Sequence, residues 1–180
     1  MTSFARLLGA EAAKLATLPA TWVALAVATA GHVLLALAGP VQVGGLLLAP
    51  AYAIAGVSVH AAGTEYRTGQ IRLTLAAVPD RTRLLTAKAV VSLTVCLLAA
   101  LPAGELAATY LLIALIGFGL AVITRGVVIP LAGLCLTPVV ATVLPRPIAA
   151  LLPVDDLPVL TVWAILCTTG AWALFCRRDS

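Results

Sequence analysis

The sequence predicts an all-α, polytopic membrane protein, and three observations lead to this fold class. The chain of 180 residues is 62% hydrophobic and only 10% charged, whereas soluble domains are about 45–50% apolar and about 25% charged. Its apolar stretches repeatedly approach the roughly 20 residues that a membrane-spanning helix needs. Its charges gather between those stretches. Six spans use about 120 residues, so residues 1–180 form a single transmembrane domain with no room for a second domain of ordinary size.

The N-terminal residues 1–19 are expected to form an amphipathic helix that lies on the membrane surface, rather than a cleavable signal peptide or a span. One face is apolar and is formed by Phe4, Leu7, Leu8, Leu15 and Leu18. The other face is interrupted by Arg6, Glu11 and Lys14. Pro19 is expected to end this helix.

Six apolar segments are predicted to cross the membrane, at residues 20–38, 43–62, 84–101, 106–124, 127–144 and 157–175. Pro50, Pro130 and Pro138 lie inside them, where packing is the usual role and hinge motion the sharper hypothesis. Gly117 and Gly119 are interpreted as a packing notch in the fourth span. Lys88 is close enough to the start of the third span to snorkel toward water.

The positive charges predict the orientation of these spans. With six spans, ten of the eleven Lys and Arg residues fall on the side of the two termini, and only Arg146 falls on the other. Cytoplasmic loops carry an excess of Lys and Arg. We therefore expect a multi-pass protein with both termini cytoplasmic. Five or seven spans would place the basic C-terminus outside.

Function is sought in the polar segment 63–88, because it holds five of the eleven Lys and Arg residues. A cation at the bilayer centre costs roughly 2.5–3.5 kcal/mol on insertion scales. This segment therefore cannot be a span and is expected to lie in the cytoplasm between the second and third spans. A charged loop in this place also has a plainer interpretation, as a topological anchor.

Residues 64–75 are expected to form a short amphipathic helix within this segment. Thr64 is suited to cap it, and Ile71 and Leu75 recur at helical spacing. Gly69 is unfavourable in a helix interior, so either the close approach of another backbone or a bend is needed to explain it. Asp80 is expected to cap the helix that follows.

No motif in the sequence predicts catalysis or a bound cofactor. A P-loop, an HExxH motif, a nucleophile elbow and a pair of intramembrane carboxylates are all missing from it. The four cysteines have no CxxC spacing and no nearby His, so we interpret them as small hydrophobic residues. The basic residues have no interleaved aromatics beyond Tyr66, which argues against nucleic-acid binding. We expect no enzyme activity, no metal and no cofactor in this chain.

Two histidines and three acids are the other polar candidates. His32 falls mid-way along the first predicted span, where an ionisable group either lines a substrate path or bonds to a neighbouring helix. His60, near the inner end of the second span, is interpreted as a helix-contact or interfacial residue. The predicted external acids are interpreted as solvated loop ends, with attraction of a cationic substrate as the alternative; they are Glu105, Asp155 and Asp156.

An ordered string of residues runs through the polar segment: Glu65, Tyr66, Arg67, Gly69, Ile71, Thr74, Leu75, Pro79 and Arg81, followed by Lys88. This string resembles the cytoplasmic loop between spans two and three of type-2 ABC transporter permeases, especially the small bacterial ones. The start of the chain, with Glu11, Lys14 and Leu15 before Trp22, is similar to the same family. So is Arg125, just after the fourth span.

The resemblance implies the permease subunit of an ATP-driven ABC exporter in the bacterial plasma (inner) membrane. Such a subunit forms a homodimer on two copies of a separate ATPase, which binds the ATP, and moves a small molecule, peptide or lipid-like substrate. Residues 64–82 would be the coupling loop that enters a cleft of the ATPase. Its contacts would come from Glu65, Tyr66, Arg67, Gly69, Ile71, Arg72, Thr74, Leu75, Pro79 and Arg81. His32 is a candidate for the substrate path because of its position in the first span, not because of the resemblance.

Two other functions are compatible with such a chain. The first is a membrane anchor or immunity-type protein that uses the same loop to recruit a soluble partner without transport. The second is a proton-coupled secondary transporter, which calls for intramembrane acids or inverted repeats; we find neither in the sequence.

Overall fold

The computed structural model describes the chain except for residues 1–3, 39–48, 79, 150, 153–155 and 179–180. The described residues form helices joined by short turns, with no strand among them. The bounds are α1 Phe4–Thr17, α2 Pro19–Ala38, α3 Ala49–Thr68, α4 Gln70–Ala77, α5 Arg81–Ala100, α6 Ala107–Thr124, α7 Val128–Val143, α8 Arg146–Ala149 and α9 Leu157–Arg178. A short 3-10 segment, Leu101–Leu106, joins α5 to α6.

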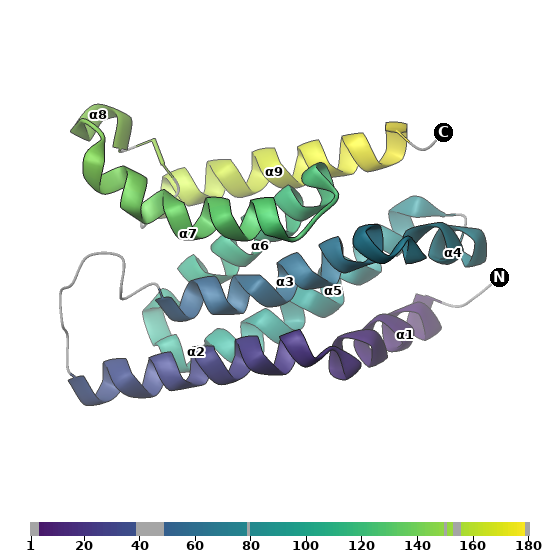
Figure 1. Cartoon of the computed structure of the whole chain (residues 1–180), viewed down its shortest axis with the longest axis horizontal. Helices are drawn as coiled ribbons and strands as arrows, with labels where there is room; N and C mark the ends of the chain where they lie inside the picture. Colours follow the sequence, from purple (N-terminus) through teal and green to yellow (C-terminus); the bar gives the residue numbers. More distant parts are fainter. Residues whose placement is uncertain (1–3, 39–48, 79, 150, 153–155, 179–180) are drawn as a thin grey trace.

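The long helices lie along one another in an elongated bundle (Figure 1). At its centre α3 packs against α6 and α2, while α6 also packs against α9, and α1 packs against α5. The N-terminus, the C-terminus and α4 all lie at the right-hand end in Figure 1, and α8 lies at the opposite end. We call the end that carries α4 the polar end, because α4 and the chain next to it carry most of the basic residues of segment 63–88.

Three segments of the described chain are long and apolar enough to cross a membrane: Pro19–Leu37, Arg81–Thr124 and Leu157–Arg177. The second contains both α5 and α6, which are separated by a sharp turn at Gly104, where φ is 58°. Val128–Ala141 is a shorter apolar helix. The span predicted at 43–62 begins outside the described residues, and α3 begins at Ala49.

Large apolar side chains on the outside of the bundle are unusually exposed. Leu37 of α2 and Val143 of α7 are each 80% exposed, and α9 also carries exposed large side chains such as Leu166. Soluble monomers rarely present extended apolar surface of this kind. This surface is suited to lipid tails or to another apolar protein surface, which agrees with a membrane protein.

The polar end differs from the prediction in the position of its helices. The helix expected at 64–75 does not begin at Thr64, because α3 continues to Thr68 and the Thr64 hydroxyl donates to the carbonyl of His60 at 2.7 Å. The break falls instead at Gly69, whose φ is 71°, and α4 follows it. A Cβ at Gly69 would meet nothing within 4 Å. Of the two explanations for this glycine, the bend is therefore correct, since only Gly enters this left-handed region without a steric cost.

Asp80 caps α5, as the sequence predicts. Its carboxylate accepts hydrogen bonds from the backbone N–H of Arg83 at 3.2 Å and from the Thr82 hydroxyl at 2.6 Å. These bonds lower the pKa of the Asp80 carboxyl below its ordinary value. They fix where α5 begins, and therefore where Lys88 lies on it.

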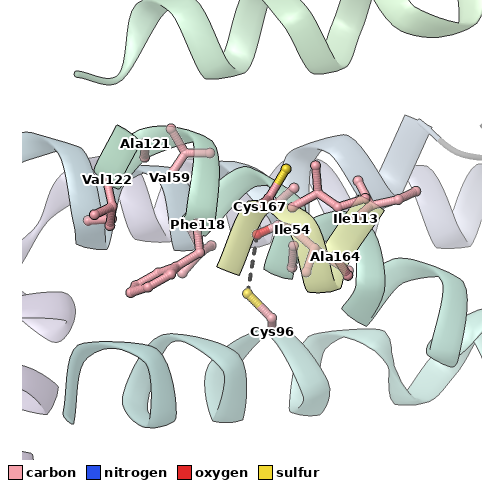
Figure 2. Close-up of a cluster of buried hydrophobic side chains, with 14 of the residues drawn as sticks. Ile54, Val59, Cys96, Ile113, Phe118, Ala121, Val122, Ala164 and Cys167 are labelled. Atoms are coloured by element: carbon pink, nitrogen blue, oxygen red, sulfur yellow. Dashed lines mark hydrogen bonds between the residues drawn. The ribbon is translucent and has the colours of Figure 1, made fainter. Parts of the chain in front are cut away.

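Small residues bring the central helices close together, and Figure 2 shows part of the buried apolar cluster between them. A Cβ added at Gly119 of α6 would lie 2.8 Å from the backbone carbon and oxygen of Cys167 in α9. A Cβ at Gly117 would lie 2.9 Å from a methyl of Val59 in α3. The predicted packing notch at these two glycines is confirmed. Figure 2 also shows the Cys96 thiol of α5 donating to the carbonyl of Ile54 in α3, at 3.4 Å.

Candidate functional site

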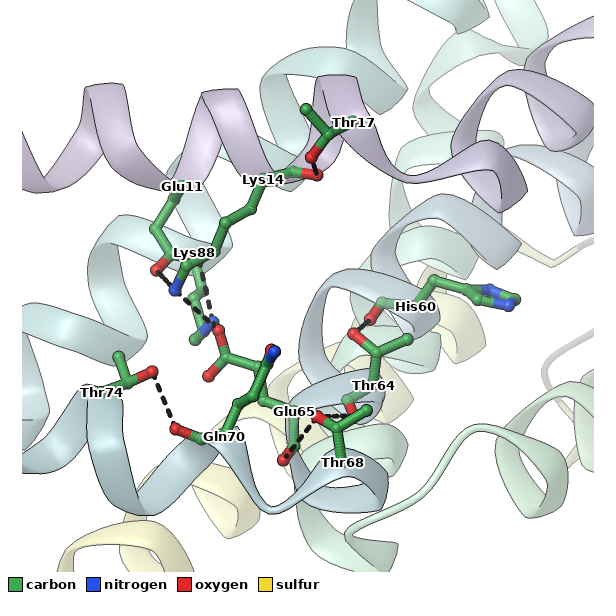
Figure 3. A network of polar contacts seen from close by, with 10 residues as sticks. All are labelled: Glu11, Lys14, Thr17, His60, Thr64, Glu65, Thr68, Gln70, Thr74 and Lys88. Atoms are coloured by element: carbon green, nitrogen blue, oxygen red, sulfur yellow. Dashed lines mark hydrogen bonds and ion pairs between the residues drawn. The ribbon is translucent and has the colours of Figure 1, made fainter.

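Four charged side chains from three helices meet at the polar end (Figure 3). Glu11 and Lys14 come from α1, Glu65 from α3 and Lys88 from α5; we call them the ion-pair cluster. The Lys88 ammonium lies 2.9 Å from Glu11 Oε2 and 2.7 Å from Glu65 Oε1. The Lys14 ammonium lies 2.8 Å from Glu11 Oε1 and 2.8 Å from Glu65 Oε1. Each cation thus bridges both anions.

Three members of the ion-pair cluster are buried. Glu11 is 5% exposed, Glu65 4% and Lys88 5%, whereas the Lys14 side chain is 44% exposed. A buried charge is tolerated when it is paired and hydrogen-bonded. Its desolvation offsets much of the attraction, so such a cluster adds little net stability and mainly fixes which partners face each other. It therefore holds α1, α3 and α5 in one relative arrangement.

The pKa of Glu65 reflects two opposing effects. Burial alone would raise it, but the positive charge of Lys88 and the hydrogen bonds from Lys14 and Lys88 outweigh that desolvation. The pKa of the Glu65 carboxyl is lowered from its ordinary value of 4.5. Burial would likewise lower the pKa of Lys14, but its bonds to Glu11 and Glu65 raise it above 10.5. Glu65 and Lys14 are therefore both charged at neutral pH.

The ion-pair cluster corrects two sequence expectations. Lys88 does not snorkel to water, because its ammonium is buried between Glu11 and Glu65. Glu11 does not lie on an outer polar face of α1, because it shares the buried face with Leu7 and Leu15. The spacing of four residues between these three positions puts them on one side of a helix. That spacing was the signal in the sequence for a buried acid.

The segment predicted to contact a partner is divided by the structure between an inner and an outer face. Glu65 is in the ion-pair cluster, and Tyr66 lies under the Arg125 guanidinium, 5.9 Å from ring centroid to Cζ. Half-buried members are Ile71, Thr74, Leu75 and Arg81. Exposed members are Arg67, Gly69 and Arg72, and Pro79 lies outside the described residues.

The outer face of α4 holds a residue that sequence reasoning missed. Leu73 is 75% exposed and lies beside Arg72. Ile71 and Leu75, which the sequence singled out as the apolar stripe, instead pack against the core of this chain. A helical stripe indicates that one face is covered, and here the bundle itself covers it. The surface left for a partner consists of Arg67, Arg72 and Leu73, which we call the α4 surface.

A cleft of about 350 Å³ opens beside the ion-pair cluster, between α1, α3, the start of α4 and α5. It is lined by Glu11, Lys14, Leu15, Thr17, Leu18, Ala61, Thr64, Glu65, Thr68, Gln70, Lys88 and Val91. Its polar part surrounds the ion-pair cluster and its apolar part lies toward the interior of the bundle. This volume is in the range of small-molecule sites.

His32 does not join this cleft. Its half-buried ring packs beside the ring of Tyr110 in α6, with the ring centroids 5.7 Å apart. The buried Nε2 atom of His32 has no hydrogen-bond partner among the described residues. His60 Nδ1 lies 2.8 Å from the carbonyl of Gly56 on its own helix. Within the described residues no group of three His, Cys, Asp or Glu side chains is placed to hold a metal ion.

No family model, curated protein or solved structure matches this chain.

Proposed function

We propose that this chain is the transmembrane permease subunit of an ATP-driven exporter in the bacterial plasma membrane. It would work as a homodimer with two copies of a separate ATPase, and its substrate would be a small molecule, a peptide or a lipid-like compound. The observation that carries the proposal is α4, a short helix at the polar end that exposes Arg72 and Leu73, is set off from α3 by Gly69 and is held to the bundle on its inner side.

The arrangement of the ends supports a six-span topology. Both termini and α4 lie at the same end of the bundle (Figure 1), as an even number of crossings requires. The helices α5 and α6 contain 20 and 18 residues, which corresponds to about 30 and 27 Å at 1.5 Å per residue. Each is therefore close to the thickness of the hydrocarbon core. The expected orientation of α1 in the membrane plane does not match the structure, because α1 continues the line of α2 and packs against α5.

The α4 surface is suited to a protein partner. Arg72 and Leu73 are exposed neighbours on α4, and Arg67 is exposed at the end of α3. Our topology places all three in water, and Arg is enriched at protein interfaces. The ion-pair cluster would carry movement of this surface to α1 and α5, because both helices share its buried charges. ATP-driven closure of the partner would thus reach the membrane-spanning helices.

The test combines partner capture with export. Arg72→Glu and Leu73→Asp should each reduce co-purification of the proposed partner ATPase, together with ATP-dependent export from vesicles, since reversing a partly desolvated interface charge costs several kcal/mol. Arg177→Glu makes the same charge reversal at the same end of the bundle, on α9, and should leave both unchanged. Normal capture and export by both α4 variants would make α4 only a topological anchor. Capture without any export by the parent would favour a recruiting anchor over a permease.

The topology has its own test. In a variant whose four native cysteines are replaced, a single cysteine at the exposed position Gln70 should react with a membrane-impermeant thiol reagent only after the cells are opened. Labelling in intact cells would contradict the six-span arrangement.

A further inference from the structure

One carboxylate oxygen in the ion-pair cluster lacks a hydrogen-bond donor. Both oxygens of Glu11 and the Oε1 atom of Glu65 accept bonds from the two lysines. Glu65 Oε2 is buried and accepts none from any described residue, and Figure 3 draws contacts to only one of the two Glu65 oxygens. A buried acceptor without a donor is costly. Glu65 lines the cleft with a side chain that is 6% exposed, and a ligand that donates an N–H or O–H would satisfy its Oε2 atom.

The hydroxyl groups around the cleft point to the same kind of ligand. Thr17, Thr64 and Thr68 each donate their proton to a carbonyl of their own helix, at 2.9, 2.7 and 3.1 Å respectively. Their oxygens therefore have only acceptor capacity left for the cleft. A group with several N–H donors, such as a primary ammonium, is complementary to such a lining.

Lys14 and the exposed Gln70, whose amide also carries N–H groups, supply donors at the cleft. Lys14 has three N–H groups, of which two are directed to Glu11 and Glu65. Its side chain is 44% exposed, so the remaining N–H can meet an anion that stays partly in water. The ion-pair cluster is neutral as a whole, so a ligand that carries one positive and one negative charge adds no net charge to it.

Apolar residues continue the cleft toward the interior of the bundle. Ala61 lies one helical turn before Glu65 on α3, and Val91 lies one turn after Lys88 on α5. Since α3 runs toward the polar end and α5 runs away from it (Figure 1), both residues lie deeper than the charges. Leu15 and Leu18 complete this apolar wall. The cleft is thus polar at one end and apolar at the other, as a site for an amphiphile must be.

We propose that this cleft binds the headgroup of phosphatidylethanolamine from the surrounding leaflet. The primary ammonium donates to Glu65 Oε2, the phosphate accepts from Lys14, and the glycerol stem runs along Ala61 and Val91. Phosphatidylcholine has the same charges, but its trimethylammonium has no N–H to donate. This site is independent of transport, so its failure would leave the proposed function unaffected.

The test compares the two lipids on one protein. The full chain is placed in nanodiscs of equimolar phosphatidylethanolamine and phosphatidylcholine, and the lipids retained on it are counted by native mass spectrometry. The parent should retain phosphatidylethanolamine about tenfold over phosphatidylcholine, the factor that one charge-assisted hydrogen bond provides. Glu65→Gln and Ala61→Leu should reduce this ratio to about one, since the first removes the carboxylate and the second fills the cleft without touching an ion pair. Ala76→Leu, the same enlargement at an exposed position of α4, should keep the full preference.

Three outcomes would overturn the proposal. They are equal retention of both lipids by the parent, a preference that survives Ala61→Leu, and displacement of the lipid by soluble O-phosphoethanolamine as effective as displacement by the lipid itself. The last would mean that a soluble amino phosphate is the ligand. If Glu65→Gln does not fold, Ala61→Leu decides alone.

Discussion

The polar end and the apolar centre hold the helices of this bundle together by different means. At the polar end α1, α3 and α5 meet through four charges, three of them buried. At the centre α3, α6 and α9 meet through glycines whose missing side chains let backbones approach. Charges attract over several ångströms, but each buried charge needs a partner of opposite sign. Contacts between small residues need no such partner, but they leave no room for an added atom. The two regions should therefore fail in different ways.

The largest effect is expected from breaking the charge balance at the polar end. Lys88→Met leaves two buried carboxylates with one partly exposed cation and should destabilise the protein by about 3–5 kcal/mol, read as a lower melting temperature in detergent. Lys88→Met combined with Glu65→Gln leaves the neutral pair of Glu11 and Lys14, and should recover most of the loss. A single variant as stable as the parent would mean that the charges do not hold these helices.

Crowding the centre should cost less, about 1–3 kcal/mol. Gly119→Ala places a methyl 2.8 Å from the backbone of Cys167, so α6 and α9 must separate. Gly117→Ala comes closest to side-chain atoms of Val59 and Leu134, at 2.9 and 3.1 Å, and reaches backbone only at 3.7 Å, the carbonyl oxygen of Ala55. Side chains can shift more easily than the backbone of a neighbouring helix. Gly133→Ala, at a position with nothing within 4 Å, serves as the open control. The melting temperature should be highest for Gly133→Ala, lower for Gly117→Ala and lowest for Gly119→Ala. Any other order contradicts the packing described.

A bend variant sharpens the comparison by changing α4 without changing charge or packing. Gly69→Ala should cost about 1–2 kcal/mol, because an L-residue is strained at a φ of 71°. Gly69→Asn should cost less, since Asn tolerates that region. Hydrogen exchange of α4 measures the difference. Equal exchange in the two variants and the parent would show that the left-handed conformation is not required.

The smallest effect should come from mild acidification. Because the folded-state pKa of Glu65 is lowered, its contribution to stability is complete above its ordinary value of 4.5 and is lost as the pH falls through the lowered value. The parent should lose melting temperature below pH 4.5 more steeply than Glu65→Gln. Parallel curves for the two proteins would mean that Glu65 is not ion-paired in solution.

The sequence predicted the helices well and their contacts poorly, for a physical reason. Helix bounds follow from local signals such as the Asp80 cap and the apolar lengths, so α2, α5, α6, α7 and α9 lie within a few residues of the predicted segments. The ion-pair cluster joins residues as far apart in the sequence as Glu11 and Lys88. A local sequence pattern does not show which distant residues come into contact. Leu73 was missed because the periodic stripe of Ile71 and Leu75 indicates a covered face without indicating what covers it.

Ser58 of α3 has a mechanical consequence for the whole bundle. Its buried hydroxyl lies 2.7 Å from the carbonyl of Ala114 in α6 and 2.8 Å from that of Ala55 in its own helix. Sliding α3 along α6 by one residue, about 1.5 Å, would break the contact with Ala114 and leave the hydroxyl only the Ala55 carbonyl of its own helix, in an apolar interior where no water replaces the lost partner. The two central helices should therefore move as one rigid body. Any opening of a path across the membrane must then come from the helices around that pair, of which α2, α7 and α9 present the most exposed apolar surface.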